Sequence, residues 1–197
     1  MSVAESPVVT RERLSAQRIV EEALKLARQE GVRGIRMRPL AARFGVSATA
    51  LYGHVASREA LLGLMLDRVL SDVPALPARL SWDESLRRGA MQLRDALESY
   101  PQLALEALGG HAATELTRTR GDELVGRLVD AGFDAEEAVR AVSCWGRWTL
   151  SYLAACEHPA PGARGRTDRA FERGVKYLLE GLRAQLGSRA QSELQPR

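Results

Sequence analysis

The sequence has no apolar run near the roughly 20 residues that a membrane-spanning helix requires. Its first residues, MSVAESPVVTRER, lack the apolar core of a secretory signal. Only two cysteines occur, Cys144 and Cys156, and they lie too far apart for a CxxC redox motif. These absences predict a protein of the reducing cytoplasm that has no membrane partner and no disulfide framework.

Histidine is scarce as well. None of the three histidines, His54, His111 and His158, belongs to an HExxH motif or to another metal-binding spacing. Gly109-Gly110 is not followed by the Lys-Ser/Thr pair of a phosphate-binding loop. We therefore expect no catalytic residues, no metal site and no cofactor, and we predict that the protein is not an enzyme.

What the sequence does contain is the composition of a globular protein. Hydrophobic residues make up 45% of its 197 residues and charged residues 27%. The net charge is only +3, but the segment from Arg11 to Arg58 holds ten Lys and Arg residues against four Asp and Glu residues. One basic end on a nearly neutral remainder is typical of a protein that places that end against phosphate.

Every segment with a clear hydrophobic period has the period of a helix, and no strand-type alternation occurs. We predict a domain boundary where Pro74 and Pro77 interrupt the pattern. The predicted parts are a flexible basic arm at 1–14, a first domain at 15–73, a second domain at 81–187 and a disordered tail at 188–197. The predicted helices are 15–30, a short pair within 36–54, 57–70, 81–100, 103–108, 114–131, 134–157 (expected to be the longest) and 167–186.

The segment RMRPLAARFGVSATALYGHVASR, residues 36–58, has the pattern of two short helices joined by a tight turn. Gly45 stands where the first helix must end, because glycine tolerates the positive φ of the turn. Ser47 is a good N-cap for the second helix, residues 48–54. The outward side chains of that helix are small or hydrogen-bonding, so it can enter the major groove of DNA. Its inward positions would be Leu51 and Val55.

The run LAARFGVSATALYGHVASREALL resembles the DNA-binding domain of TetR-family transcriptional regulators, through its Gly-Val-Ser turn, the Leu51-Tyr52 and His54-Val55 pairs and the basic residue at Arg58. The resemblance implies an all-α fold. An N-terminal three-helix helix-turn-helix DNA-binding domain would be followed by a helical-bundle domain for ligand binding and dimerisation. Carried over to this sequence, the DNA contacts fall on Arg36, Arg38, Ser47, Ala48, Thr49, Ala50, Tyr52, Gly53, His54 and Arg58.

The predicted recognition helix is unusually poor in long polar side chains, because no Gln, Asn, Lys or Arg lies between Ser47 and His54. Thr49 can hydrogen-bond a base edge or a phosphate, and an alanine can meet a thymine methyl group. Direct base contacts would be sparse. We expect Arg36, Arg38 and the shape of the DNA to supply more of the specificity.

A single short recognition helix contacts too few base pairs to be specific, and helix-turn-helix proteins therefore dimerise. The 134–157 helix carries two apolar stripes and must be covered on two sides. The final helix contains small residues that permit close approach, so we expect these two helices of each protomer to form a four-helix bundle. Alternatively, both stripes form the core of a monomer. The expected interface residues are Val142, Gly146, Thr149, Leu153, Phe171, Gly174, Leu178 and Leu182.

Aromatic residues of the second domain are expected to enclose a pocket for a small, largely apolar effector of unknown identity. This expectation rests largely on the resemblance, and the alternative is that these side chains fill the core or the dimer interface. The expected lining residues are Trp82, Tyr100, His111, Trp145, Trp148 and Tyr152.

The function that follows is a homodimeric repressor that a ligand releases from a palindromic operator in double-stranded DNA. Helix 57–70 would transmit the change between the two domains, and the coupling would be set by the ligand's differential affinity for the two forms. The alternatives are an activator, or a regulator that answers to a protein partner instead of a small molecule, because a fold does not fix either property.

Overall fold

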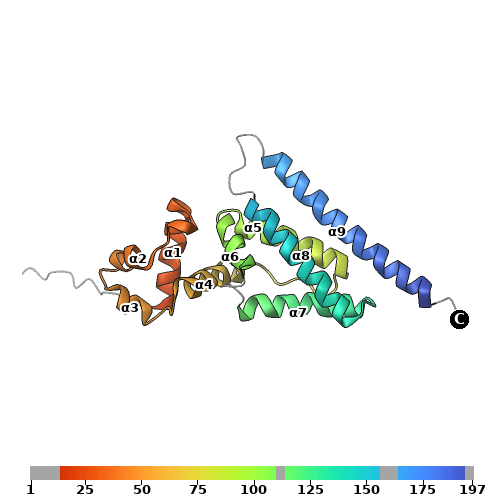
Figure 1. The fold of residues 1–197 in the computed structure, drawn as a ribbon, viewed down its shortest axis with the longest axis horizontal. Coiled ribbons are helices and arrows are strands. Elements are labelled where there is room, and N and C mark those ends of the chain that lie inside the picture. Colours follow the sequence, from red (N-terminus) through yellow and green to blue (C-terminus); the bar gives the residue numbers. More distant parts are fainter. Residues whose placement is uncertain (1–13, 110–113, 156–163, 194–197) are drawn as a thin grey trace, which may run out of the picture.

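The structure is a computed structural model that describes residues 14–109, 114–155 and 164–193. Within these ranges every regular element is a helix, which confirms the all-α prediction (Figure 1). The predicted arm lies outside the described residues except for Leu14, and so do residues 194–197. The elements are α1 (Ala16–Glu30), η1 (Val32–Gly34), α2 (Met37–Arg43), α3 (Ala48–Tyr52), α4 (Arg58–Ser71), α5 (Trp82–Leu97), α6 (Pro101–Leu108), α7 (Glu115–Asp130), α8 (Ala135–Ala155) and α9 (Arg164–Glu193).

Helices α1 to α4 form the N-terminal part, which the sequence predicts to bind DNA and which we therefore call the DNA-binding segment (Figure 1). Helix α1 begins at Ser15, whose hydroxyl oxygen accepts a hydrogen bond from the Arg18 amide at 3.3 Å. It ends at Gly31, whose φ of 77° is a conformation that other residues rarely adopt. A helix with one apolar face buries that face against its neighbours. In α1 this face consists of Ile19, Val20, Ala23, Leu26 and Ala27.

A segment without helix, residues 72–81, connects α4 to α5 and is held by α7. The Arg127 guanidinium donates to the carbonyls of Leu76 at 3.1 Å and Pro77 at 3.0 Å. It also donates to the Leu80 carbonyl and to the Ser85 hydroxyl. Since the prolines of this segment prevent a helix, its carbonyls need partners from elsewhere, and one arginine supplies several of them.

Helices α5 to α9 form the C-terminal bundle, in which α8 contacts α5, α6, α7 and α9. The prediction that 134–157 is the longest helix is wrong, because α9 has 30 residues and α8 has 21. The predicted disordered tail is also wrong for residues 188–193, which continue α9 as a helix. Gly187 costs a helix only about 1 kcal/mol, and the good helix formers around it outweigh that cost.

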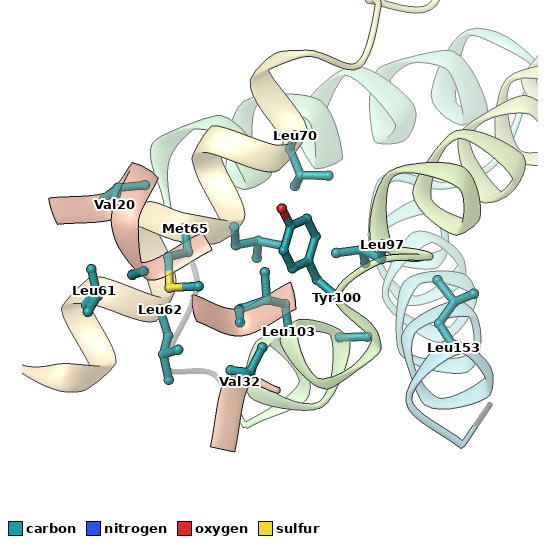
Figure 2. Close-up of a cluster of buried hydrophobic side chains, with 14 of the residues drawn as sticks. Val20, Val32, Leu61, Leu62, Met65, Leu70, Leu97, Tyr100, Leu103 and Leu153 are labelled. Atoms are coloured by element: carbon teal, nitrogen blue, oxygen red, sulfur yellow. The ribbon is translucent and has the colours of Figure 1, made fainter. Parts of the chain in front are cut away.

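The two parts meet in a buried apolar cluster (Figure 2). Val20 of α1 and Leu62 and Met65 of α4 lie on one side of it, with Tyr100 and Leu103 from the start of α6 on the other. These side chains are at most 5% exposed. The DNA-binding segment is therefore packed against the C-terminal bundle. A displacement of α6 would be transmitted to α4 through these packed side chains.

Candidate nucleic-acid interface

The turn between α2 and α3 has the geometry that its sequence predicts. Gly45 has a φ of 66°, in the left-handed region that favours glycine. The Val46 amide then donates back to the Ala41 carbonyl at 3.2 Å and closes the turn. The Ser47 hydroxyl accepts from the Ala50 amide at 3.2 Å and caps α3. These local bonds fix the direction in which α3 leaves α2.

Helix α3 buries one side and exposes the other. Leu51 is fully buried and Val55, just beyond the helix, is 2% exposed. Tyr52 is 47% exposed, which favours its predicted availability over burial in the small domain. Of the remaining predicted contact residues around α3, Ala48 is half-buried, and Ser47, Thr49, Ala50, Gly53 and His54 are exposed.

The arginines near α3 divide into free and engaged groups. Arg36 and Arg38 are exposed, and neither side chain forms a hydrogen bond or ion pair with the residues that the structure describes. Arg43 instead donates to the Glu22 carboxylate at 2.7 Å. Burial opposes ionisation of Glu22, but the hydrogen bond from Arg43 and the nearby charges of Lys25 and Arg43 outweigh it and lower the pKa of Glu22. Arg36 and Arg38 are thus the cations here that can meet a phosphate without breaking an internal contact.

The side chain of Arg58, the first residue of α4, contacts other groups of the protein. Its guanidinium donates to the backbone carbonyls of Ile35 at 3.1 Å and Val32 at 3.4 Å. A further nitrogen lies 3.7 Å from the Glu106 carboxylate of α6. Arg58 therefore joins α4 to η1 and to α6. Its contact with a phosphate stays a prediction, and the guanidinium would have to make that contact in addition to these internal ones.

The structure does not gather the predicted effector residues into one place. Trp82 packs edge-on against Phe133 at 5.2 Å between ring centroids, and the Tyr100 hydroxyl accepts from Arg28. The ring of Trp145 lies against Gly89 of α5. Trp148 and Tyr152 pack with Phe171 of α9. His111 lies outside the described residues.

A cleft of about 550 Å³ lies where α1 and α4 face α5. Of the predicted effector residues, only Tyr100 lines it. Its other walls carry charges of both signs, including Lys25, Arg28 and Asp95. It is therefore unlike the aromatic pocket that the sequence predicts.

Half of the predicted dimer residues are used inside the protomer, and the prediction is corrected for them. Thr149 and Phe171 are at most 1% exposed and Leu153 is 8% exposed, so they pack the protomer's own core. Gly174 lies against Trp148 of the same chain, where an added Cβ would overlap the ring. The predicted dimer residues that stay half-buried at the surface are Val142, Gly146, Leu178 and Leu182.

Sequence periodicity missed a set of polar contacts between the DNA-binding segment and the bundle. The Gln102 side chain of α6 accepts from the Arg33 amide at 3.0 Å. The Thr114 hydroxyl, which caps α7, donates to Asp67 of α4. Arg120 of α7 donates to the Leu70 carbonyl at 3.0 Å, near the end of α4. No pattern along the chain indicates these pairs, because their members lie 47 to 69 residues apart.

Together, the capped turn, the short helix with one exposed side and the two free arginines define a helix-turn-helix DNA-binding protein. Residues 19–65 match the model of the tetR family of bacterial regulatory proteins, and residues 73–167 match the tetracyclin repressor-like C-terminal domain. The chain belongs to the TetR family of transcriptional regulators. Among the residues that the structure describes, no helix is long and apolar enough to cross a membrane and no three potential metal ligands cluster.

Curated relatives and solved structures agree with this assignment. An HTH-type transcriptional regulator of Saccharopolyspora erythraea is 30% identical, over 90% of this chain and 88% of its own length. The class D tetracycline repressor protein of Escherichia coli is 28% identical, over 88% and 91%. The structure of Mycobacterium smegmatis BioQ superposes with a TM-score of 0.77 at 27% identity, covering 87% of this chain and 99% of that one. BioQ with its double-stranded DNA operator gives a TM-score of 0.73 at 25% identity, with the same coverage.

Proposed function

We propose that this regulator is a homodimeric repressor in the bacterial cytoplasm, and that a small, largely apolar molecule releases it from a palindromic operator. The exposed side of α3, flanked by the unpaired Arg36 and Arg38, is the observation that carries the proposal. On this proposal the protein regulates transcription by binding the operator and the effector, and it catalyses no reaction.

On DNA, α3 would enter the major groove with Thr49 and Ala50 toward the base edges. Tyr52 and His54 would hydrogen-bond phosphates at the groove edge, and both are exposed as this role requires. Since these groups can distinguish few base pairs, the arginines and the deformability of the site would contribute the remaining specificity.

The partner protomer would dock on the outer side of α8 and α9. Besides the four half-buried residues of the predicted set, this side exposes Val139 by 51% and Tyr177 by 62%. An added Cβ at Gly146 or Gly181 would meet no atom within 4 Å, so the partner's helices can approach closely there. Large exposed hydrophobic side chains beside open glycines support a helix-to-helix interface.

Release requires that the effector bind better to a form whose two recognition helices are wrongly spaced. Several curated relatives are named tetracycline repressor proteins, which supports a small-molecule effector here. The contacts of α6 with the DNA-binding segment, from Gln102 to η1 and from Glu106 to α4, provide a direct route from the bundle to this segment.

Selection of bound sequences from a random pool of duplex DNA tests the proposal. We expect a palindrome whose half-sites are separated by about one helical turn or a multiple of it. Replacing Arg36 and Arg38 together by alanine should abolish the enrichment. Replacing Arg118 and Arg140, two exposed arginines of the bundle, removes the same charge and should preserve it. A protein that is monomeric at all concentrations, or that enriches no duplex, refutes the proposal.

A second candidate is a regulator that answers to a protein partner, or one that activates transcription. The rings of Trp148, Tyr152 and Phe171 pack on one another, as in a filled interior. A panel of apolar small molecules, with tetracycline included because of the relatives' names, distinguishes the two. If none of them changes operator affinity, the protein-partner alternative is favoured. The sign of regulation follows from a reporter gene placed behind the selected operator.

A further inference from the structure

Two polar atoms in the interior of the bundle have no partner. The indole nitrogen of Trp145 and the hydroxyl oxygen of Thr149 are buried and form no hydrogen bond with any residue that the structure describes. The two residues lie one helical turn apart, so they share a face of α8. Ser85, another buried polar residue, differs in this respect, because its hydroxyl donates to the Ser81 carbonyl at 2.7 Å and accepts from Arg127.

Unpaired buried polar groups are rare in folded proteins, since each forfeits its hydrogen bonds to water without replacement. Two on one face of one helix therefore require an explanation. Where such groups persist in a natural sequence, a ligand or an ordered water usually completes them, at a site kept for function at the expense of stability.

The side chains around Trp145 and Thr149 restrict which molecule can serve as their hydrogen-bond partner. The buried face of α8 consists of Ala138, Ala141, Trp145, Thr149 and Leu153, and carries no ionisable group. The arginines of this helix, Arg140 and Arg147, are exposed. A charged ligand on the buried face would lose its hydration without gaining a counter-ion from α8, which is strongly unfavourable. An uncharged ligand does not meet this penalty.

The donor and acceptor properties of the indole N–H and the threonine hydroxyl restrict the chemistry of the ligand further. An indole N–H can only donate, so its partner must be an acceptor. A threonine hydroxyl can donate to the same acceptor or to a second one nearby. A carbonyl oxygen accepts two hydrogen bonds, and the two side chains are separated by one turn of helix, about 5–6 Å between Cβ atoms.

We propose that Trp145 and Thr149 are the polar contacts of the effector site, and that the site takes an uncharged, mostly apolar ring compound with a ketone-type carbonyl. The site lies on the inner face of α8, where this helix packs on α5 and α6. It rests on the proposed function, because it specifies the effector of that function. Thr149, predicted at the dimer interface, is thereby assigned to the effector site.

The test uses Thr149→Val, which replaces the hydroxyl by a methyl group of similar size. Because the hydroxyl lacks a partner, the unliganded variant should be more stable than the wild type, with a thermal midpoint higher by roughly 2 °C or more. Ser151→Ala is the control, since Ser151 is exposed on the same helix and should change the midpoint little. A lower midpoint in Thr149→Val means that the hydroxyl has a partner in the protein and overturns the proposal.

Ligand binding is measured with 9-fluorenone and fluorene, which differ only in that a carbonyl replaces a CH₂ group. Isothermal titration should show that the wild type prefers fluorenone by roughly tenfold, as one well-made hydrogen bond provides. The preference should fall in Thr149→Val and in Trp145→Phe, because each variant leaves the carbonyl one donor, and it should disappear in the double variant, while Ser151→Ala keeps it. No binding of fluorenone, or an equal preference in wild type and variants, overturns the proposal and assigns the two atoms to internal water.

Operator binding separates this outcome from a failure of the proposed function. Wild type and Thr149→Val should bind the selected operator with the same affinity, and fluorenone at a given concentration should weaken the wild-type complex more than the Thr149→Val complex. If another small molecule, such as tetracycline, releases both proteins equally, the proposed function stands and the assignment of Trp145 and Thr149 is overturned. If the wild type does not bind the operator at all, the proposed function itself has failed.

Discussion

Replacing Gly174 of α9 by alanine should destabilise the protein, although alanine is the better helix former. A Cβ at this position would overlap the ring of Trp148, with Cη2 only 2.5 Å away. The ring cannot retreat freely, because it stacks on Phe171 at 5.7 Å between centroids and lies 5.4 Å from Tyr152. The indole, or α9 as a whole, must shift.

Gly126 provides the matched control for this substitution. It is exposed, lies within helix α7, and a Cβ there would meet nothing within 4 Å. Both substitutions gain the same helix propensity of about 1 kcal/mol, and only Gly174→Ala suffers overpacking, which costs about 1–3 kcal/mol. The difference between the two variants isolates the packing cost. For a chain of this length it corresponds to a midpoint difference of roughly 2–4 °C per kcal/mol.

Urea unfolding, followed by helical circular dichroism and by tryptophan fluorescence, measures both variants. The measurement is repeated at two protein concentrations, because a weakened dimer makes the midpoint depend on concentration whereas a packing defect does not. Equal unfolding free energies for Gly174→Ala and Gly126→Ala, at equal denaturant dependence, would refute the contact between Gly174 and Trp148 and with it the packing of α9 on α8.

Three other perturbations have definite expected results. Arg38→Ala should reduce the slope of log affinity against log salt by about one unit if Arg38 contacts a phosphate, whereas Arg118→Ala should leave the slope unchanged. Arg127→Met should lower the unfolding free energy by roughly 1–2 kcal/mol, since several partly buried carbonyls lose their charged donor; an unchanged urea midpoint would contradict this. Burial opposes ionisation of Asp83, but hydrogen bonds from Ser81 and Arg183 outweigh it and lower its pKa, so its contribution to stability is complete above the unfolded pKa and lost as pH falls below about 4. Asp83→Asn should remove that acid-side loss in thermal scans between pH 3 and 6.

The DNA-binding segment could be predicted from the sequence because its signals are local. Gly45 and Ser47 fix the turn through bonds to residues three or four positions away. Leu51 and Val55 are buried as their spacing predicts. Helix caps at Ser15 and Ser57 likewise set the starts of α1 and α4. Such signals depend on chain geometry alone.

The C-terminal bundle was predicted less well because its helices have several neighbours. The sequence shows that α8 is apolar on more than one side, but not which side faces the protomer's own core. The structure places Thr149 and Leu153 inward and leaves Val142 and Gly146 at the surface. In α9 it buries Phe171, Val175 and Leu179 and leaves Leu178 and Leu182 half-buried at the surface.

By itself the sequence determined that this protein is helical throughout its patterned segments, where its short helix α3 begins, and which side of that helix is exposed. These properties are set within a few residues of chain, by hydrophobic period, caps and a glycine turn. Only the tertiary structure decided that Arg58 is held by carbonyls and Glu106, and that Trp145 and Thr149 face inward without partners. Contacts between distant helices depend on how the helices rotate against one another, which no local pattern fixes.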